Sequence, residues 1–500
     1  MVKKKMVLLT GATGTMGEAT LQELLKESNF KIVVLIRNNK KDKKIIGKYK
    51  KEPNLTIKFG DITEFEIVED CLKNVDIVLH CAALVSPEAD DYPELAMKVN
   101  YGGTVNLIKA IKEQPNWEMI RFVNIGTVAE TGDRMPPIHW GRVGDPIKPS
   151  VHDYYAVSKI AAERAVIESG LKYWVSLRQT GILCEKMAKI KDGIIFHNCL
   201  DNVLEYVTDK DSGILMKNCC YELPEKFWRH IYNIGGGESC RISCYDLFRE
   251  MFALLGIKKL EYIIDAKWFA TRNFHGQYYL DSDKLDDYLH FRNSDKQYFY
   301  KIYLKNMGII VPIVKLFTKL PGGEKLTGKF IKKRFEKILF CERGTMNWIE
   351  NNRKDWIDPF FISQKRWEQI PKLNERKCYQ EWNKVSIIKH GYDETKPESD
   401  LTIMDVKEAA KYRGGQCLSD TMIKGDWSTK IKWQCAFGHE FSASPKLILE
   451  GGHWCPICEQ KSWNYQEIAK RNPFFAQVWY PLHDIDEPSV EYIKLVQEEE

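Results

Sequence analysis

The sequence predicts an α/β protein with a doubly wound parallel sheet, a smaller second domain and a metal-binding module at its C-terminal end. Three observations predict this. A glycine-rich turn follows the first apolar segment, apolar segments and helical patterns alternate over the first 180 residues, and cysteine and histidine residues cluster between positions 435 and 458. The 500 residues are enough for two to four domains of roughly 100–200 residues.

The glycine-rich turn lies between an apolar segment, residues 6–9, and a helical pattern, residues 18–26. A strand, a glycine turn and a helix in this order typically bind the pyrophosphate of a dinucleotide at the helix N-terminus. Gly11 permits the tight turn, Gly14 lets the backbone approach the phosphates, and Gly17 lets helix and strand pack closely. Three further residues of the turn are expected to contact the cofactor: Thr13, Thr15 and Met16.

Apolar segments of strand length alternate with helical patterns after this turn. The predicted strands are residues 31–36, 55–59, 76–81 and 121–125, and the predicted helices between them are residues 64–73 and 95–112. Nearly continuous apolar strands that alternate with helices indicate a parallel sheet covered on both faces.

Arg37 ends the second predicted strand, 20 residues beyond Gly17. An acidic residue at this position binds the ribose hydroxyls of NAD, whereas a guanidinium group suits the 2′-phosphate of NADP. We therefore expect NADP, with NAD as the alternative. A solvated basic loop, which continues through residues 40–44, is the other interpretation of Arg37.

Tyr155 and Lys159 are four residues apart in a helical pattern and therefore share a face. An ammonium group nearby stabilises a phenolate and lowers the pKa of the tyrosine, so that Tyr155 could exchange a proton near neutral pH. The alternative is a surface tyrosine beside a lysine. The glycine turn at the expected distance, and Thr127 after the fifth predicted strand, favour the catalytic interpretation.

These features together resemble the extended short-chain dehydrogenase/reductase family, of the NAD-dependent epimerase/dehydratase type, over about the first 250 residues. The segments that carry the resemblance are residues 10–17, 60–61, 80–83, 100–104, 127, 155–159, 178–181 and 232–235. The resemblance implies a Rossmann-like fold, with Tyr155 as the acid/base, Lys159 on the nicotinamide ribose and Thr127 on the substrate oxygen. It places the remaining cofactor contacts at Asp61, Ile62, Ala82, Ala83 and Asn100, with Asn100 in a supporting role. One departure is Ile125-Gly126, where the family usually carries serine.

The function that these residues predict is that of an NADP(H)-dependent oxidoreductase or epimerase. The expected small-molecule substrate is a sugar, a sugar nucleotide or another carbonyl or hydroxyl compound. Because residues 9–14, 35–37 and 80–85 also resemble thioester reductase domains, reduction of a thioester or aldehyde is an alternative. A second alternative is a binding protein that senses NADP(H) and holds a partner through its metal module.

The second predicted domain, residues 181–395, contains an unusually basic segment. Residues 296–337 hold eleven Lys or Arg against two Glu, interleaved with aromatic and aliphatic residues. Such a segment can bind a membrane surface or an anionic acyl carrier. The alternative is a solvated pair of helices that caps the substrate cleft.

The C-terminal segment, residues 396–500, carries a zinc pattern. Cys435 and His439 precede Cys455 and Cys458, with 15 residues between the two pairs. Four ligands at this spacing fit a closed tetrahedral zinc site with a structural role, and Cys417 or His453 could replace His439. The pattern resembles treble-clef and zinc-ribbon domains. We expect the module to serve packing, oligomerisation or partner binding rather than nucleic-acid binding.

The composition is that of a globular protein, with 44% hydrophobic and 29% charged residues and a net charge of +5. This small net charge does not favour nucleic acid as a partner. No signal peptide and no apolar run of about 18 residues is visible, and the cysteines form no disulfide framework. We therefore expect a cytoplasmic protein with reduced thiols, with a homo-oligomer as one possible state.

Overall fold

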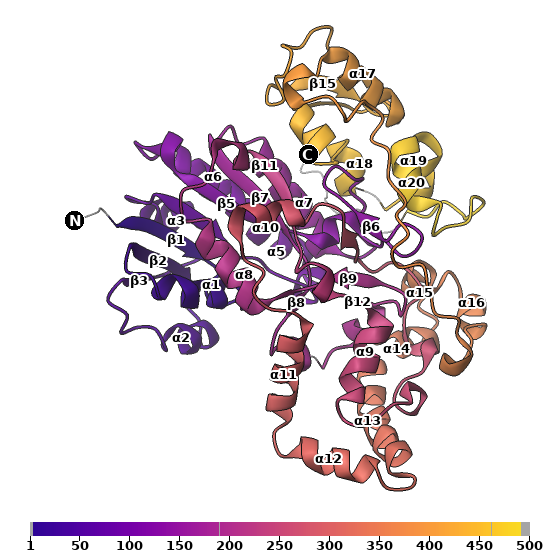
Figure 1. Ribbon diagram of the computed structural model, residues 1–500. Helices are drawn as coiled ribbons and strands as arrows, with labels where there is room; N and C mark the ends of the chain where they lie inside the picture. The colour runs from indigo at the N-terminus through magenta and orange to yellow at the C-terminus, as the bar shows by residue number, and fades with distance from the viewer. Residues whose placement is uncertain (1–3, 190, 462, 492–500) are drawn as a thin grey trace.

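The computed structural model describes residues 4–189, 191–461 and 463–491 (Figure 1). At its centre is a seven-stranded sheet in the order β3-β2-β1-β4-β5-β7-β11, in which all neighbouring strands are parallel. The strands are β1 (Lys5–Thr10), β2 (Phe30–Ile36), β3 (Leu55–Phe59), β4 (Ile77–His80), β5 (Arg121–Thr127), β7 (Tyr173–Gln179) and β11 (His230–Ile234). Successive strands are added on one side of β1, as β2 and β3, and then on its other side, beginning with β4. Doubly wound sheets bind their ligands at this switch point between β1 and β4.

Helices cover both faces of the sheet, because the strands are apolar on both sides. One face packs against α1 (Thr15–Leu25), α2 (Lys40–Ile46), α8 (Asp209–Asn218) and α10 (Asp283–Leu289). The other packs against α3 (Phe65–Cys71), α6 (Gly103–Lys112) and α7 (Tyr154–Ile167). The predicted doubly wound α/β fold is thus confirmed.

The predicted helix over residues 95–112 is interrupted. It consists of α5 (Pro93–Ala96), a π-helical turn (Met97–Gly102) and α6, and it follows the short helix α4 (Glu88–Asp91). The wider turn places Asn100 in the interior, where its amide bonds the backbone N–H and C=O of Leu84 at 2.7 and 2.9 Å. Local π-helical turns of this kind are frequent at functional sites.

Residues between β7 and the C-terminal module, together with β6 from the loop after β5, form small strand pairs and a set of helices beyond the carboxyl ends of the sheet strands (Figure 1). The strand pairs are β6 (Trp140–Gly141) with β13 (Tyr278–Tyr279), β8 (Ile182–Leu183) with β10 (Val207–Thr208), and β9 (Val203–Glu205) with β12 (Arg241–Ser243). The helices are α9 (Cys244–Ala253), α11 (Lys296–Met307), α12 (Ile310–Thr318), α13 (Gly323–Leu339), α14 (Thr345–Glu350), α15 (Lys354–Phe361) and α16 (Gln364–Glu368). Within the described ranges, no helix combines the length and the apolar character needed to cross a lipid bilayer.

The C-terminal module lies at the opposite end of the molecule from α12 (Figure 1). It contains α17 (Ile403–Tyr412), an antiparallel sheet of β14 (Gln416–Cys417), β15 (Ile431–Gln434) and β16 (Glu440–Ala443), and then α18 (Pro456–Lys461), α19 (Tyr465–Arg471) and α20 (Pro473–Trp479). The buried residues around its antiparallel sheet, Trp433 and Leu447 among them, belong to the same hydrophobic cluster as Phe122 and Trp174 of the large sheet. The module therefore packs on the α7 face of the sheet as part of one continuous core.

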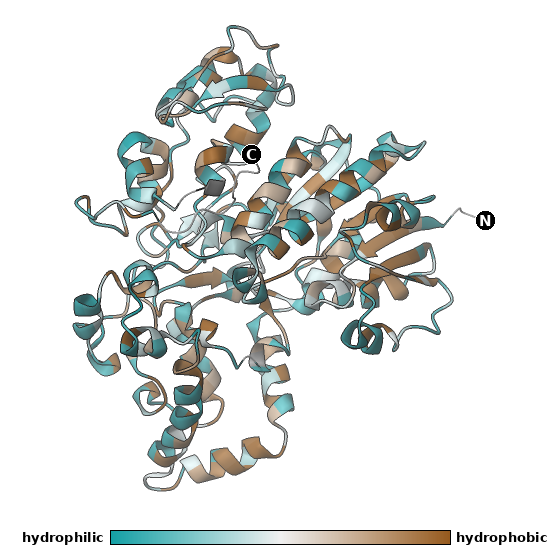
Figure 2. Cartoon of the chain, turned by 180° about the vertical axis from the view of Figure 1, so that it is seen from behind, coloured by the Kyte–Doolittle hydropathy of each residue, from teal (hydrophilic) through white to brown (hydrophobic). Residues whose placement is uncertain are grey.

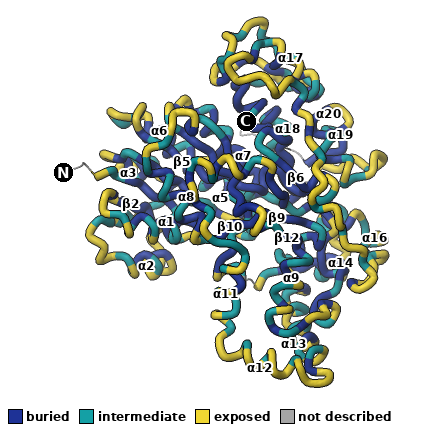
Figure 3. Tube along the Cα trace, in the orientation of Figure 1, coloured by how far each residue is buried: buried dark blue, intermediate teal, exposed yellow. Residues whose placement is uncertain are grey.

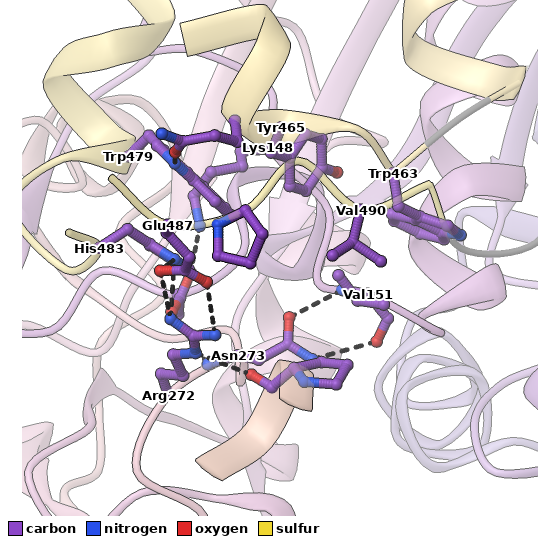
Figure 4. A pocket seen from close by; sticks show the side chains of 14 residues that line it. Lys148, Val151, Arg272, Asn273, Trp463, Tyr465, Trp479, His483, Glu487 and Val490 are labelled. Carbon is purple, nitrogen blue, oxygen red and sulfur yellow. Dashed lines mark hydrogen bonds and ion pairs between the residues drawn. The ribbon is translucent and has the colours of Figure 1, made fainter. Parts of the chain in front are cut away.

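The chain beyond α20 packs back onto the body of the protein. Glu487 accepts two hydrogen bonds from Arg272, at 2.7 and 2.9 Å, and His483 lies against the same guanidinium group (Figure 4). The His483 ring also stacks on Trp479. This bidentate pair fastens the last described residues to the middle of the chain.

Candidate active site

The glycine turn between β1 and α1 has the backbone that the sequence predicts. Gly11 has φ +72°, and a Cβ atom there would lie 2.6 Å from the backbone N of Ala82, which follows β4. A Cβ atom on Gly17 would lie 2.1 Å from the carbonyl oxygen of Gly11. Helix α1 begins at Gly14 without a side-chain cap, which leaves N–H groups of its first turn for an anion. The turn is thus shaped to hold a pyrophosphate at the β1/β4 switch point.

Arg37 is tied to this turn through a carboxylate that the sequence analysis did not identify. Asp42 is buried and accepts hydrogen bonds from Thr13 Oγ1 at 2.8 Å, Arg37 Nε at 3.0 Å and Asn39 Nδ2 at 2.6 Å. Burial opposes ionisation of Asp42, but the bonds from Thr13 and Asn39 and the Arg37 charge outweigh it and lower its pKa. The Arg37 side chain is nevertheless 60% exposed.

The other residues predicted to bind the cofactor line the same edge of the sheet. Asp61 and Ile62 follow β3, and the Asp61 carboxylate accepts the N–H of Thr63 at 2.9 Å. Ala82 and Ala83 follow β4. The Asn100 side chain forms hydrogen bonds with the backbone of Leu84 and donates one to Ser158 Oγ at 2.8 Å. Asn100 therefore holds the loop after β4 in place.

Thr127 and Tyr155 are brought together by β5 and α7. Thr127 is the last residue of β5, and α7 begins after Asp153, whose carboxylate caps Ala156 N–H at 2.8 Å. The Thr127 side chain lies near enough to the Tyr155 hydroxyl to influence its pKa. Lys159 lies one turn further along α7 and is buried. The structure therefore assembles the three predicted catalytic side chains at the carboxyl end of the central strands.

The pKa of Tyr155 differs from the expected one. Burial raises it, and the hydrogen bond to Thr127 only partly opposes this shift. The pKa of Tyr155 is thus raised rather than lowered as predicted, and Lys159 is not among the groups that shift it most. Burial lowers the pKa of Lys159, and the carboxylates of Glu130 and Glu163 counteract that shift. The reason is that desolvation penalises the charged forms of both side chains.

A buried charge network lies directly behind these three residues. Glu130 Oε1 accepts the N–H of Thr127 at 2.9 Å, and Arg178 contacts Glu130 at 3.2 Å and Glu163 at 2.5 Å. All three charged side chains are at most 1% exposed. Burial and the charge of Glu163 raise the pKa of Glu130, whereas Arg178 keeps that of Glu163 low. Glu163 thus carries the negative charge that pairs with Arg178.

Gly126 leaves the space that this network needs. A Cβ atom on Gly126 would lie 3.0 Å from Glu130 Oε1, 3.1 Å from Glu163 Oε2 and 3.2 Å from Arg178 Cγ. A serine here would crowd the two carboxylates. Glycine at position 126, where the family usually carries serine, therefore leaves room for the buried charges beneath it.

The C-terminal module completes the network. His453 Nε2 lies 3.1 Å from Glu163 Oε1, and the backbone carbonyl of Gly451 accepts a hydrogen bond from Arg178 at 2.7 Å. Arg164 of α7 bonds both the Trp454 carbonyl and the Glu459 carboxylate at 2.8 Å. Residues 451–459 therefore contact the interior of the nucleotide-binding fold immediately behind the site.

Sequence analysis missed Glu130, Glu163 and His453 as components of the site. The spacing Thr127-x-x-Glu130 is that of a capping box, which the structure contains, and it is a local signal that could have identified Glu130. Glu163 and His453 are 290 residues apart. Nothing local in the sequence pairs them.

Cys435, His439, Cys455 and Cys458 form the predicted four-ligand cluster. The sulfurs of Cys435 and Cys458 are 3.9 Å apart, and the three thiols lie 3.4–3.6 Å from His439 Nδ1. Tetrahedral zinc with ordinary bond lengths requires about 3.8 Å between sulfurs and about 3.6 Å between sulfur and nitrogen. The donor set and its spacing fit zinc. Cys417 and His453 lie outside the cluster, since Cys417 bonds the Ser419 carbonyl and His453 bonds Glu163.

The fold and the candidate site together define a doubly wound α/β domain with a threonine, a tyrosine and a lysine at the carboxyl edge of its sheet. Residues 7–185 match the model of the NAD dependent epimerase/dehydratase family. The resemblance predicted from the motifs is confirmed for this part of the chain.

Curated relatives match only in part. The UDP-glucose 4-epimerase of Vibrio cholerae is 30% identical over 173 residues, which are 33% of this chain and 46% of that protein. That of Rickettsia bellii (strain OSU 85-389) is 33% identical over 110 residues, 21% of this chain and 32% of that protein. The match thus spans about a third to a half of the length of these relatives.

Solved structures with a similar chain include two proteins with bound NAD. The UDP-glucuronic acid 4-epimerase of Bacillus cereus, in complex with UDP-glucuronic acid and NAD, has a TM-score of 0.48 and 18% identity, and the match covers 60% of this chain and 99% of that one. The dTDP-glucose 4,6-dehydratase of Bacillus anthracis str. Ames, in complex with NAD, has a TM-score of 0.48 and 19% identity, with 61% and 98% covered.

Proposed function

We propose that this protein is an NAD(P)-dependent epimerase or oxidoreductase of sugar nucleotides. The observation that carries the proposal is the position of Thr127 beside Tyr155, one helical turn from Lys159, next to a glycine turn shaped for a pyrophosphate. The names of the partly matching relatives support the substrate class. A protein that only sensed the cofactor would not need a hydroxyl pair positioned for proton transfer.

Tyr155 and Thr127 handle the proton on the substrate oxygen. When a hydroxyl is oxidised, its O–H proton passes to the Tyr155 oxygen. Thr127 donates a hydrogen bond that orients this oxygen, and Lys159 would hold the cofactor ribose with its ammonium group. A bound nicotinamide would supply the hydride chemistry. For an inversion, Tyr155 would return the proton to the same oxygen.

Zinc is proposed as a structural component of the module. The four-ligand set is closed, so it leaves no position for a substrate. Zinc would fix Cys455 and Cys458, and thereby the intervening and adjacent residues that contact Arg164 and Glu163. In this proposal the module supports the active site from behind.

The substrate class is tested by incubating the full chain with UDP-glucose, UDP-galactose or dTDP-glucose and either cofactor. Proton NMR then follows inversion, and absorbance at the nicotinamide band follows net redox change. Inversion without net redox change supports an epimerase. Net consumption of NADPH with a thioester, and none of these sugar conversions, would instead assign a thioester reductase.

The reaction is expected to depend on pH through Tyr155. Because burial raises the pKa of Tyr155, the phenol predominates at neutral pH, and hydroxyl oxidation requires the phenolate. The single-turnover rate of oxidation should therefore rise with pH, by about tenfold per pH unit below the pKa. Stopped-flow measurement of nicotinamide reduction checks this. A flat profile would show that Tyr155 does not limit the proton transfer.

The preference for NADP is tested at Arg37. Replacing Arg37 by Ser should raise the KM for NADPH by about tenfold or more and leave that for NADH within about twofold, because only NADPH carries a 2′-phosphate. Lys51→Ser removes an exposed charge elsewhere in the same region and serves as the control. Equal changes for both cofactors would contradict a phosphate contact at Arg37.

A further inference from the structure

Helices α11, α12 and α13 form an arm that projects from the body of the protein, with α12 at its tip (Figure 1). None of the residues of α12 is buried. Helix α12 has nine residues, which is a length of about 14 Å, so it is far too short to span a bilayer.

Helix α12 is apolar on both sides. Val311 and Val314 face inward and pack against the cluster that contains Leu255, and Thr318 Oγ1 lies 3.4 Å from the Leu255 carbonyl. The outward side should then be polar, as on an ordinary surface helix. Instead, six apolar residues of α12 and its flanks are exposed: Ile309 (79%), Ile310 (53%), Ile313 (61%), Leu316 (69%), Phe317 (39%) and Leu320 (54%). Figure 2 shows this helix largely brown, and Figure 3 shows the same segment largely exposed.

The exposed face continues onto α13, where it becomes mixed with positive charge. Leu326 and Phe330 are 59% and 64% exposed. Basic residues surround them and the α12 tip: Lys305, Lys315, Lys319, Lys325, Lys329, Lys333 and Arg334. Within the described part of the chain, none of these seven forms an ion pair with a carboxylate, in contrast to Lys296, which lies 3.3 Å from Glu250. Glu324, the one acidic residue at the start of α13, is occupied by the backbone N–H groups of Lys258 and Lys259 at 2.8 Å.

We propose that this face, formed by α12 and the outer side of α13, docks onto the surface of an anionic lipid bilayer. Helix α12 would lie in the plane of the interface with its exposed apolar side chains below the headgroups, and the unpaired lysines would contact lipid phosphates. A convex helix at the tip of an arm suits a deformable lipid surface better than a rigid partner. A second copy of the chain would bring two faces of like charge together, which is unfavourable. This inference is independent of the proposed function.

The test uses the full chain and vesicles of phosphatidylcholine, alone or mixed with phosphatidylglycerol, in a cosedimentation assay. The wild-type chain should bind the anionic vesicles more tightly than the neutral ones by about tenfold or more, and added salt should weaken this binding. No binding to either vesicle would overturn the proposal. An affinity that is unchanged by lipid charge and by salt would contradict the role proposed for the lysines.

Variants separate the apolar and the basic contributions. Ile313→Asp combined with Leu316→Asp should abolish vesicle binding, and Lys315→Gln with Lys329→Gln should reduce it several-fold. Because these side chains are exposed, thermal melting should be unchanged. Ile423→Asp is the matched control, since Ile423 is 77% exposed on the distant C-terminal module. Vesicle binding that survives Ile313→Asp/Leu316→Asp would overturn the proposal. Two other results would also overturn it. The wild-type chain could fail to bind vesicles but form a dimer in sedimentation velocity, or bind an acidic acyl carrier. In either case the double variant would remove that association.

Discussion

Replacing Tyr155 by Phe is expected to lower kcat by about two to four orders of magnitude, while the Kd for the nicotinamide cofactor stays within about twofold. The substitution removes only the hydroxyl that lies beside Thr127, and it leaves the ring and the fold of α7 in place. Single-turnover rates with a sugar nucleotide and cofactor titrations by fluorescence measure the two quantities. The effect should fall on the chemical step because the hydroxyl does not contact the glycine turn.

Tyr154→Phe is the matched control, because it removes a tyrosine hydroxyl from the adjacent position of the same helix. Tyr154 packs beside Trp463 of the C-terminal module rather than at Thr127. Its replacement should leave kcat within about twofold. Full activity of Tyr155→Phe, or equal losses in both variants, would remove Tyr155 from the mechanism. Thr127→Val should give an intermediate loss, since it removes the orienting hydrogen bond but keeps the acid/base.

Removal of the metal is expected to have the second large effect. Cys455→Ser, or treatment with a strong chelator, should lower the melting temperature by roughly ten degrees or more, because the energy of zinc binding contributes directly to folding. Elemental analysis should find one zinc ion per chain in the wild type. The activity should fall as well, because Cys455 lies between His453 and Glu459, which contact Glu163 and Arg164.

Cys417→Ser is the control for the metal prediction. Cys417 is on β14 of the same module but outside the ligand cluster, so its replacement should change neither the zinc content nor the activity. If Cys455→Ser retained the melting temperature of the wild type and the wild type contained no zinc, the cluster would be a set of free thiols. If stability fell but activity of the folded fraction did not, the module would not support the active site.

The link between the module and the active site is electrostatic. Arg178, Glu130 and Glu163 are at most 1% exposed, and such groups are tolerated in an interior only when each is paired and hydrogen-bonded. His453 and the Gly451 carbonyl supply two of those bonds. Displacement of the module would leave the network partly unsatisfied, and Glu130 holds the N–H of Thr127. This is the physical route by which a metal site could affect catalysis.

The sequence alone predicted the features that depend on short-range patterns. The glycine turn follows from the steric demands at Gly11 and Gly17, and the strands from runs of apolar residues. Tyr155 and Lys159 follow from helical spacing, and Cys455 and Cys458 from the geometry of a zinc knuckle. Each of these depends on residues within a few positions of one another, so the sequence carries the full signal.

Only the tertiary structure decided the properties that depend on what covers a residue. Burial reversed the expected pKa shift of Tyr155, and packing placed His439, rather than Cys417 or His453, in the four-residue cluster. The pairing of Glu163 with His453 joins positions 290 residues apart. Ile313 is exposed because, within the described chain, no other segment covers that side of α12. Desolvation and long-range contact are properties of the assembled fold, because they are set by neighbours in space rather than by neighbours in sequence.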